Sequence, residues 1–347
     1  GLWRLVSIFA IEMKKILVTG GLGYIGSHTV VELLSVGFDV VVIDNLNNSK
    51  EEVKARIEDI AGRNFELCIG DVNDAATLEA LFVKHTFDGV IHFAAHKAVG
   101  ESVDNPVMYY QNNVSGLISL LSTMEKHKVS NLIFSSSCTV YGAATDLPVT
   151  EKTLIQKAES PYGTTKILGE DIINDFAKHK EFKSILLRYF NPVGAHPSAK
   201  IGELPLGVPN NLVPYITQTA AGIREQLTVF GEDYNTEDGT CIRDYIHVVD
   251  LAKAHVKAMT YCQDMSHNVD VFNVGTGKGN TVLEVIRAFE KVNGVKLNYK
   301  IGPRRGGDIE QIYADTSKVN ALLGWSAQYD IADMMQHAWA WQQGLQD

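Results

Sequence analysis

Tyr162 and Lys166 are four residues apart, a spacing that puts two side chains on the same face of a helix. A tyrosine that removes the proton of an alcohol must have its pKa lowered from about 10 to about 7, which requires roughly 4 kcal/mol. One positive charge at about 4 Å supplies a free energy of that size at an effective dielectric constant of about 20. The spacing therefore predicts an acid/base tyrosine that is activated by a lysine and by any further positive charge nearby.

The Tyr-x-x-x-Lys step does not establish this chemistry alone. In a chain with 13 tyrosines the step is expected roughly once by chance, and an ordinary amphipathic helix would carry the same two residues. The context is more specific, because Ser137 ends a predicted strand upstream and a glycine-rich turn precedes both. We therefore predict Ser137, Tyr162 and Lys166 as the catalytic residues.

The glycine-rich turn contains Gly20, Gly23 and Gly26, with Tyr24 and Ile25 before the last glycine. It follows a β-branched apolar run directly and opens a stretch with helical apolar spacing. Glycine permits the unusual dihedral angles of such a turn and the close approach of a pyrophosphate, which the free N–H groups at the helix N-terminus bind. The G-x-x-G-x-x-G spacing predicts a dinucleotide site, and a structural loop is the less specific explanation.

Asp44 ends the second apolar run, 18 residues after Gly26, near the position of a carboxylate that binds an adenosine ribose. A carboxylate there repels a 2′-phosphate, so the sequence favours NAD over NADP as cofactor. A turn or capping residue is the alternative for Asp44. Asp71 and Val72 are predicted to meet the adenine, although an ordinary loop aspartate explains Asp71 nearly as well.

Five short apolar runs, each separated by enough residues for a helix, predict parallel strands that are buried on both faces. They cover residues 16–19, 40–43, 90–93, 132–134 and 185–188. The fold class is therefore α/β, with a Rossmann-type doubly wound parallel sheet. Phe93, Ala94 and Ala95 follow one strand at the rim where such sheets bind ligands.

The amino-acid composition changes after about Asn191, where prolines and glycines become frequent, as is typical of loops and short elements. We predict an NAD-binding domain over 13–192 and a smaller mixed α/β substrate domain over 193–347. Two later stretches, near 243–260 and 271–275, are expected to return to the first domain.

Composition excludes several classes of function. The formal net charge of −10 opposes nonspecific binding to nucleic acid or to anionic membranes. The four cysteines are scattered without a C-x-x-C spacing, so we expect no metal site, no disulfide framework and a reducing cytoplasmic location. Residues 1–12 are expected to be a leader that precedes a native start at Met13, with a short membrane-surface anchor as the alternative.

From Met13 to the C-terminal region the chain resembles the extended short-chain dehydrogenase/reductase family. The resemblance rests on long stretches, at residues 17–28, 97–102, 134–142 and 187–197. It is strongest to the branch that epimerises UDP-sugars at C4. It implies that Ser137 hydrogen-bonds the sugar 4-oxygen and that Tyr162 is the base. Lys166 would hold the nicotinamide ribose and lower the pKa of the tyrosine.

The resemblance also implies further ligand contacts. Additional NAD contacts fall on Asn45, Asn48, Ser49, Lys97, Asn112 and Phe190. Lys97, Ser137 and Tyr162 would also meet the UDP-sugar, together with Asn191, Asn211, Leu212, Thr228, Phe230, Arg243, Tyr245, Val282, Arg305, Asp308 and Ile312. Arg243 and Arg305 make chemical sense independently, because a diphosphate in an acidic protein needs local charge-assisted donors. Ordinary packing or a surface ion pair is the alternative for each groove residue.

The implied activity is the interconversion of UDP-glucose and UDP-galactose through a 4-keto sugar, with NAD kept bound because net redox is zero. Related 4,6-dehydratases and decarboxylases place a carboxylate just after the serine, whereas Ser137 is followed by Cys138 and Thr139. Both of those chemistries are disfavoured.

Two alternatives stay open. Ile312 occupies the position that decides in this family whether N-acetylated sugars fit, so epimerisation of UDP-N-acetylglucosamine, alone or in addition, is one. The other is an NAD-sensing scaffold without catalysis, which the joint presence of Ser137, Tyr162 and Lys166 disfavours. A homodimer that pairs through helices near Asn112 and Tyr162 is expected from the resemblance only.

Overall fold

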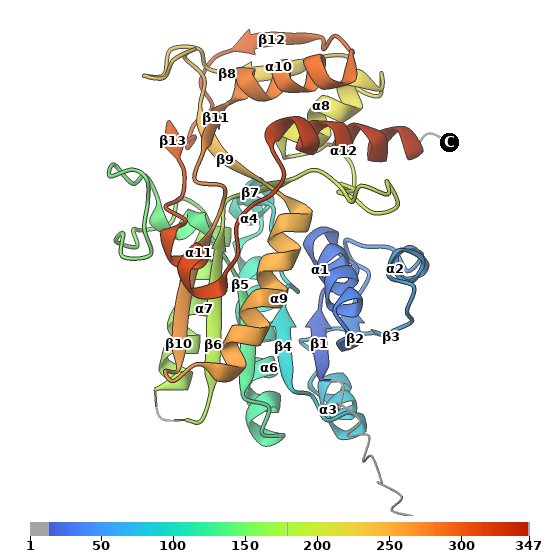
Figure 1. The fold of residues 1–347 in the computed structure, drawn as a ribbon. Coiled ribbons are helices and arrows are strands. Elements are labelled where there is room, and N and C mark those ends of the chain that lie inside the picture. The colour runs from blue at the N-terminus through green and yellow to red at the C-terminus, as the bar shows by residue number, and fades with distance from the viewer. Residues whose placement is uncertain (1–13, 179, 346–347) are drawn as a thin grey trace, which may run out of the picture.

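The computed structural model describes residues 14–178 and 180–345, so the predicted leader at 1–12 lies outside the described residues. The centre of the fold is a seven-stranded parallel sheet with the order β10-β6-β5-β4-β1-β2-β3 (Figure 1). Its strands are β1 (Lys15–Thr19), β2 (Asp39–Asp44), β3 (Glu66–Ile69), β4 (Gly89–His92), β5 (Asn131–Ser137), β6 (Lys183–Tyr189) and β10 (Val269–Val274). All five predicted strands lie in this sheet, which confirms the Rossmann-type fold.

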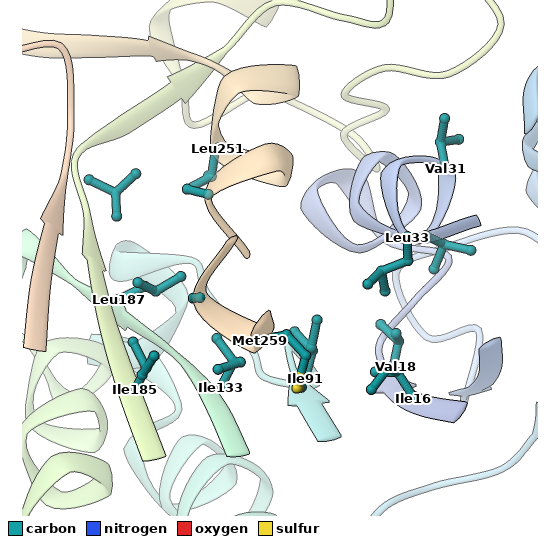
Figure 2. Packing of buried hydrophobic residues seen from close by; sticks show 14 of the residues in the cluster. Ile16, Val18, Val31, Leu33, Ile91, Ile133, Ile185, Leu187, Leu251 and Met259 are labelled. Atoms are coloured by element: carbon teal, nitrogen blue, oxygen red, sulfur yellow. The ribbon is translucent and has the colours of Figure 1, made fainter. Parts of the chain in front are cut away.

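Helices cover both faces of the central sheet, and this explains why its strands are apolar on both sides. One face carries α1 (Tyr24–Ser35), α2 (Val53–Ala61), α9 (Val248–Asp264) and α11 (Ser317–Leu323), and the other carries α3 (Ala75–Lys84), α6 (Gly116–Lys126) and α7 (Pro161–Ala177). Along β1 the side chains alternate, so Ile16 and Val18 join the first cluster and Leu17 joins the second. Figure 2 shows the first cluster, with Leu33 of α1 and Met259 of α9 packed over the strands.

The strand order reverses at β1, which pairs with β2 on one side and with β4 on the other. Open α/β sheets bind ligands at the carboxyl ends of the strands beside such a reversal. The glycine turn follows β1 at this edge. Ser137 ends β5, two strands away along the sheet.

A smaller mixed α/β unit lies beyond this edge (Figure 1). Its main sheet contains β7 (Asn191–Val193), β9 (Ile242–His247), β11 (Gly279–Thr281) and β13 (Gln311–Ile312), and β8 (Leu227–Phe230) pairs with β12 (Tyr299–Gly302). Its helices are α8 (Leu212–Ala220), α10 (Val282–Asn293) and α12 (Ile331–Gly344). Capping boxes fix the starts of two helices, Thr281 with Glu284 for α10 and Asp330 with Asp333 for α12.

The two late stretches differ in where they lie. Residues 271–274 belong to β10, which lies at the edge of the central sheet beside β6. In the stretch near 243–260, the helix α9 packs on the central sheet, but the strand β9 lies in the smaller sheet. The expectation for this strand is therefore wrong, because β9 finds its partners in three segments far apart in sequence, which its own residue pattern does not indicate.

Short helical segments complete the edge near the site. They are α4 (Val99–Asp104), α5 (Pro106–Tyr109), the π-helical turn η1 (Tyr110–Ser115) and the 3₁₀ turn η2 (Cys138–Tyr141). Within the described ranges, no helix combines the length and the apolar character needed to cross a membrane.

Candidate active site

The glycine turn leaves no room for side chains. The φ of Gly20 is +69°, and a Cβ on this residue would lie 2.9 Å from the backbone nitrogen of Ala94. A Cβ on Gly26 would lie 2.2 Å from the carbonyl oxygen of Gly20. Because Gly23 offers no side-chain cap at the start of α1, the first N–H groups of the helix are available to a phosphate. These features fit the pyrophosphate of a dinucleotide.

Asp44 is buried and holds the turn together. Its carboxylate accepts hydrogen bonds from Leu22 N (3.0 Å), Leu46 N (3.0 Å) and Ser49 Oγ (2.7 Å). The predicted ribose carboxylate therefore also fixes the glycine turn and the loop after β2. Ser49, a predicted cofactor residue, lies directly at this carboxylate.

The predicted adenine side of the site is assembled by polar contacts between loops. Asn45 donates to Asp71 (3.0 Å), and Asn73 bridges Asp71 and Asn112 at 3.0 and 3.5 Å. The side chain of Val72 packs instead into the hydrophobic cluster under the sheet. The structure thus brings Asn45, Asp71 and Asn112 together.

The catalytic helix α7 begins where the sequence places its signals. The Ser160 side chain accepts from Gly163 N (3.1 Å), and Pro161 occupies the first turn, as expected at a helix start. Tyr162 and Lys166 then lie one turn apart over the end of β5. The Lys166 ammonium donates to the Ser135 carbonyl oxygen at 2.6 Å and lies 5.8 Å from the centre of the Tyr162 ring.

Burial dominates the electrostatics of these groups. It raises the pKa of Tyr162 to about 12, against a hydrogen bond with Ser137 that lowers it. It also lowers the pKa of Lys166 to about 8, against the charge of Glu170. Activation of Tyr162 by Lys166 together with a further positive charge stays a prediction. The positive charge of an oxidised nicotinamide is the further group that the chemistry requires.

Other predicted cofactor residues lie at the same edge of the central sheet. The Tyr24 hydroxyl donates to the Gly194 carbonyl oxygen at 2.6 Å, and the Lys97 ammonium lies 5.6 Å from the centre of the Tyr24 ring. Ala94 N donates to the Thr19 hydroxyl at the end of β1 (3.2 Å). Phe93 packs partly against the first hydrophobic cluster.

The predicted sugar-nucleotide residues of the smaller unit come from several strands. Asn191 pairs with Tyr245, and Arg243 pairs with Ile312 in the sheet around β9. Arg305 forms an ion pair with Asp308 (2.8 Å) and lies 5.2 Å above the Phe230 ring. These contacts bring two groups together, one around β9 and one at the end of β8.

Several predicted groove residues face the interior. Tyr245 is buried in the hydrophobic cluster of the smaller unit, and Leu212 and Val282 pack partly against it. Thr228 lies on β8 in register with Lys300. These positions contribute packing, whereas Arg243, Arg305 and Asp308 contribute charge.

Ile312 is buried beside the serine end of the site. It shares one cluster with Cys138 and with the predicted cofactor residue Phe190. An open hollow of about 470 Å³ lies next to this cluster, between segments 143–147 and 307–311. The size of residue 312 therefore bears on space close to Ser137.

Two residues of the site were not predicted. Asn113 accepts from His96 N (2.8 Å), donates to His96 O (3.0 Å) and donates to Thr165 of α7 (3.0 Å), so it ties the rim loop to the catalytic helix. Glu203 accepts from Asn211 (2.8 Å) and lies 3.9 Å from the Lys97 ammonium. Neither has a local sequence signal, because Asn113 contacts Thr165 and Glu203 lies near Lys97, both distant in sequence.

The parallel sheet, the glycine turn and the Ser-Tyr-Lys group define an NAD-dependent enzyme of the short-chain dehydrogenase/reductase type. A family model described as GDP-mannose 4,6 dehydratase matches residues 17–338. UDP-glucose 4-epimerase 2 of Arabidopsis thaliana is 50% identical over 332 residues, covering 94% of this chain and 95% of that protein. The UDP-glucose 4-epimerase of Haemophilus influenzae is 50% identical over 328 residues, covering 94% and 97%.

Solved structures agree. UDP-glucose-4-epimerase from Stenotrophomonas maltophila, with bound NAD and formylated UDP-arabinopyranose, superposes with a TM-score of 0.94 at 47% identity, covering 96% of this chain and 99% of that chain. UDP-glucose 4-epimerase from Bifidobacterium longum, in complex with NAD⁺ and UDP, gives 0.92 at 48% identity, covering 95% and 98%. The chain belongs to the GDP-mannose 4,6 dehydratase family, in the branch of the UDP-glucose 4-epimerases.

The glycine turn generates a direct test. Gly26→Val should lower the NAD content of the purified protein at least about tenfold, because the new side chain collides with the Gly20 carbonyl and displaces the turn. Gly344→Ala is the control, since its Cβ meets nothing nearer than 3.9 Å. NAD is measured by its absorbance after denaturation of equal amounts of folded protein. A folded Gly26→Val protein with wild-type NAD content would contradict the assignment.

Proposed function

We propose that the enzyme interconverts UDP-glucose and UDP-galactose by reversible oxidation at C4 of the hexose, with NAD bound throughout. The observation that carries the proposal is the placement of Ser137, Tyr162 and Lys166 at the carboxyl end of β5, beside the glycine turn, in a chain half identical to UDP-glucose 4-epimerases. Residues 13–192 would form the NAD-binding domain and residues 193–347 the UDP-sugar domain, with α9 and β10 returning to the first.

The roles of the residues follow from acid/base chemistry. Bound NAD supplies the acceptor, and later the donor, of the hydride at C4. Tyr162, as its phenolate, accepts the proton of the 4-hydroxyl group while Ser137 orients that oxygen. Arg243 and Arg305 would hold the diphosphate while the keto sugar turns about it and presents the opposite face of C4 to the hydride donor, which inverts C4. Tyr162 would then return the proton to the 4-oxygen.

Dehydration is not supported, although the matching family model carries a dehydratase name. Cys138 and Thr139 follow Ser137 where elimination of water would need acidic groups. The buried Asp244 accepts four hydrogen bonds, from the backbone and hydroxyl of Thr276 and from the backbones of Gly277 and Ala314. Both oxygens of the Asp244 carboxylate are used to join these loops. Asp244 is therefore not available as the acid that elimination of water would need.

Replacement of the base tests the activity. Tyr162→Phe should lower the rate of conversion of UDP-galactose to UDP-glucose by about 10²–10⁴-fold, because the proton acceptor is removed while the ring still fills its site. Product formation is followed by proton NMR without added NADH. A wild-type protein that binds NAD but converts neither UDP-sugar would favour the alternative of an NAD-sensing scaffold.

The size of residue 312 tests substrate range. Because Ile312 is buried against Cys138 and Phe190, Ile312→Ser should raise the kcat/KM ratio of UDP-N-acetylgalactosamine to UDP-galactose about tenfold or more, and Ile312→Tyr should lower it. Ile301→Ser, on the exposed strand β12, is the control. If the kcat/KM ratio is unchanged in both Ile312 variants, residue 312 does not select between these substrates.

We also propose a homodimer that pairs through the segment from α4 to α6. Exposed apolar side chains gather there: Val99, Val103, Val107, Met108, Tyr110 and Ile118. Exposed apolar side chains that form one patch mark an interaction surface. A reducing location such as the cytoplasm is proposed in addition, and Cys68, Cys138, Cys241 and Cys262 are all free thiols.

A charge in this surface should separate the subunits. Val103→Glu and Val107→Glu, at positions 58% and 66% exposed, should yield monomers in size-exclusion chromatography with light scattering, because a buried unpaired carboxylate opposes association. Val36→Glu is the matched control, since Val36 is 61% exposed but follows α1. Dimers that persist in both test variants would place the interface elsewhere.

A further inference from the structure

A buried ion pair lies one helical turn from Lys166. Glu170, one helical turn after Lys166 on α7, is 2% exposed, and its partner Arg188 on β6 is 4% exposed. The guanidinium binds the carboxylate with both edges, at 2.9 Å from Nε to Oε1 and 2.6 Å from Nη2 to Oε2. The proton-transfer scheme above uses neither residue.

The pair reaches the strand that presents the catalytic serine. The hydroxyl of Ser136, the neighbour of Ser137, donates to Glu170 Oε1 at 2.5 Å. Arg188 Nη1 donates to the Tyr141 hydroxyl (3.1 Å), which donates in turn to Asn273 Oδ1 of β10 (2.5 Å). A single buried network therefore connects α7 with β5, β6, η2 and β10.

The negative charge of the Glu170 carboxylate acts on Lys166. Lys166 is buried, and Glu170 is the group whose charge opposes the loss of its proton. A buried ion pair contributes little to stability when well-packed apolar residues can replace it. The network therefore points to a role in the site in addition to its part in packing.

We propose that Glu170 is a positioning residue of the active site, whose carboxylate, fixed by Arg188 and Ser136 one helical turn from Lys166, places a negative charge near that lysine and holds α7 in register with the end of β5. The proposal rests on the proposed function, because it requires a charged Lys166 beside the reacting tyrosine. Glu170, one helical turn after the Tyr-x-x-x-Lys step, thereby has a role in the chemistry of the site.

The other titratable groups around Lys166 do not replace this carboxylate. His92 on β4 is stacked on Phe134, and burial lowers its pKa to about 3, so it is neutral. Burial raises the pKa of two groups on η2, beside α7, Tyr141 to about 12 and Cys138 to about 12. Tyr189 of β6 lies on the other face of the sheet, against His255 of α9. From the side of α4 and α5, Glu101 is engaged by the Tyr109 hydroxyl at 2.7 Å.

The pH dependence of turnover tests the proposal. Lys166 has a pKa of about 8 in the folded protein, so activity that needs its charge falls as pH rises through this value. Removal of the negative charge in Glu170→Gln lowers the pKa of Lys166 further, and the alkaline limb of kcat should move to lower pH by about one unit or more. Asp175→Asn is the control, because it removes one carboxylate from the exposed side of the same helix, where Asp175 pairs with Lys178, and it should leave the limb in place.

Two further measurements keep the test decisive. If Glu170→Gln does not fold, the double variant Glu170→Gln/Arg188→Met, which removes both charges of the ion pair, should fold. A downward shift is again expected, because Glu170 is the charged group that raises the pKa of Lys166. NMR titration of lysine labelled with ¹³C at Cε, with the Lys166 signal assigned through Lys166→Arg, reports its pKa without turnover. A folded variant with the wild-type limb and the wild-type Lys166 titration would overturn the proposal. A wild-type protein without conversion would overturn only the proposed function.

Discussion

The site depends on one close contact, between helix α7 and strand β5. Lys166 donates to the Ser135 carbonyl oxygen at 2.6 Å, and a Cβ on Gly169 would lie 2.5 Å from the Phe134 ring. A larger residue at 169 would force the helix away from the strand. Because Ser137 lies on the strand and Tyr162 on the helix, this contact sets the distance between the proposed base and the proposed substrate-orienting serine.

The same contact buries Tyr162 and Lys166, and burial disfavours the charged form of each. A dry site disfavours both the phenolate of Tyr162 and the ammonium of Lys166, as the opposite directions of their pKa shifts show. The protein compensates the lysine with the Glu170 carboxylate, whereas the tyrosine depends on charge brought by the cofactor.

The contacts between the central sheet and the smaller unit are also polar and specific. Tyr24, at the start of α1, donates to the carbonyl oxygen of Gly194, just after β7. Asp244 of β9 joins the loop after β10 to Ala314, and a Cβ on Gly275 would lie 2.5 Å from its carboxylate. These bonds hold β9, which carries the predicted diphosphate residue Arg243, against the end of the central sheet.

The sequence by itself determined the parallel sheet, the glycine turn and the helix that carries Tyr162 and Lys166, because periodicity, capping and turn chemistry are local properties of the chain. Ser160 and Pro161 mark the start of that helix whatever surrounds it. Only the tertiary structure decided the sheet to which β9 belongs, the contacts of Asn113 and Glu203, and the network of Glu170. Each depends on partners distant in the chain, as with Asn113 and Thr165, which are 52 residues apart. Burial, which shifts the pKa values of the site, likewise arises only when these segments pack together.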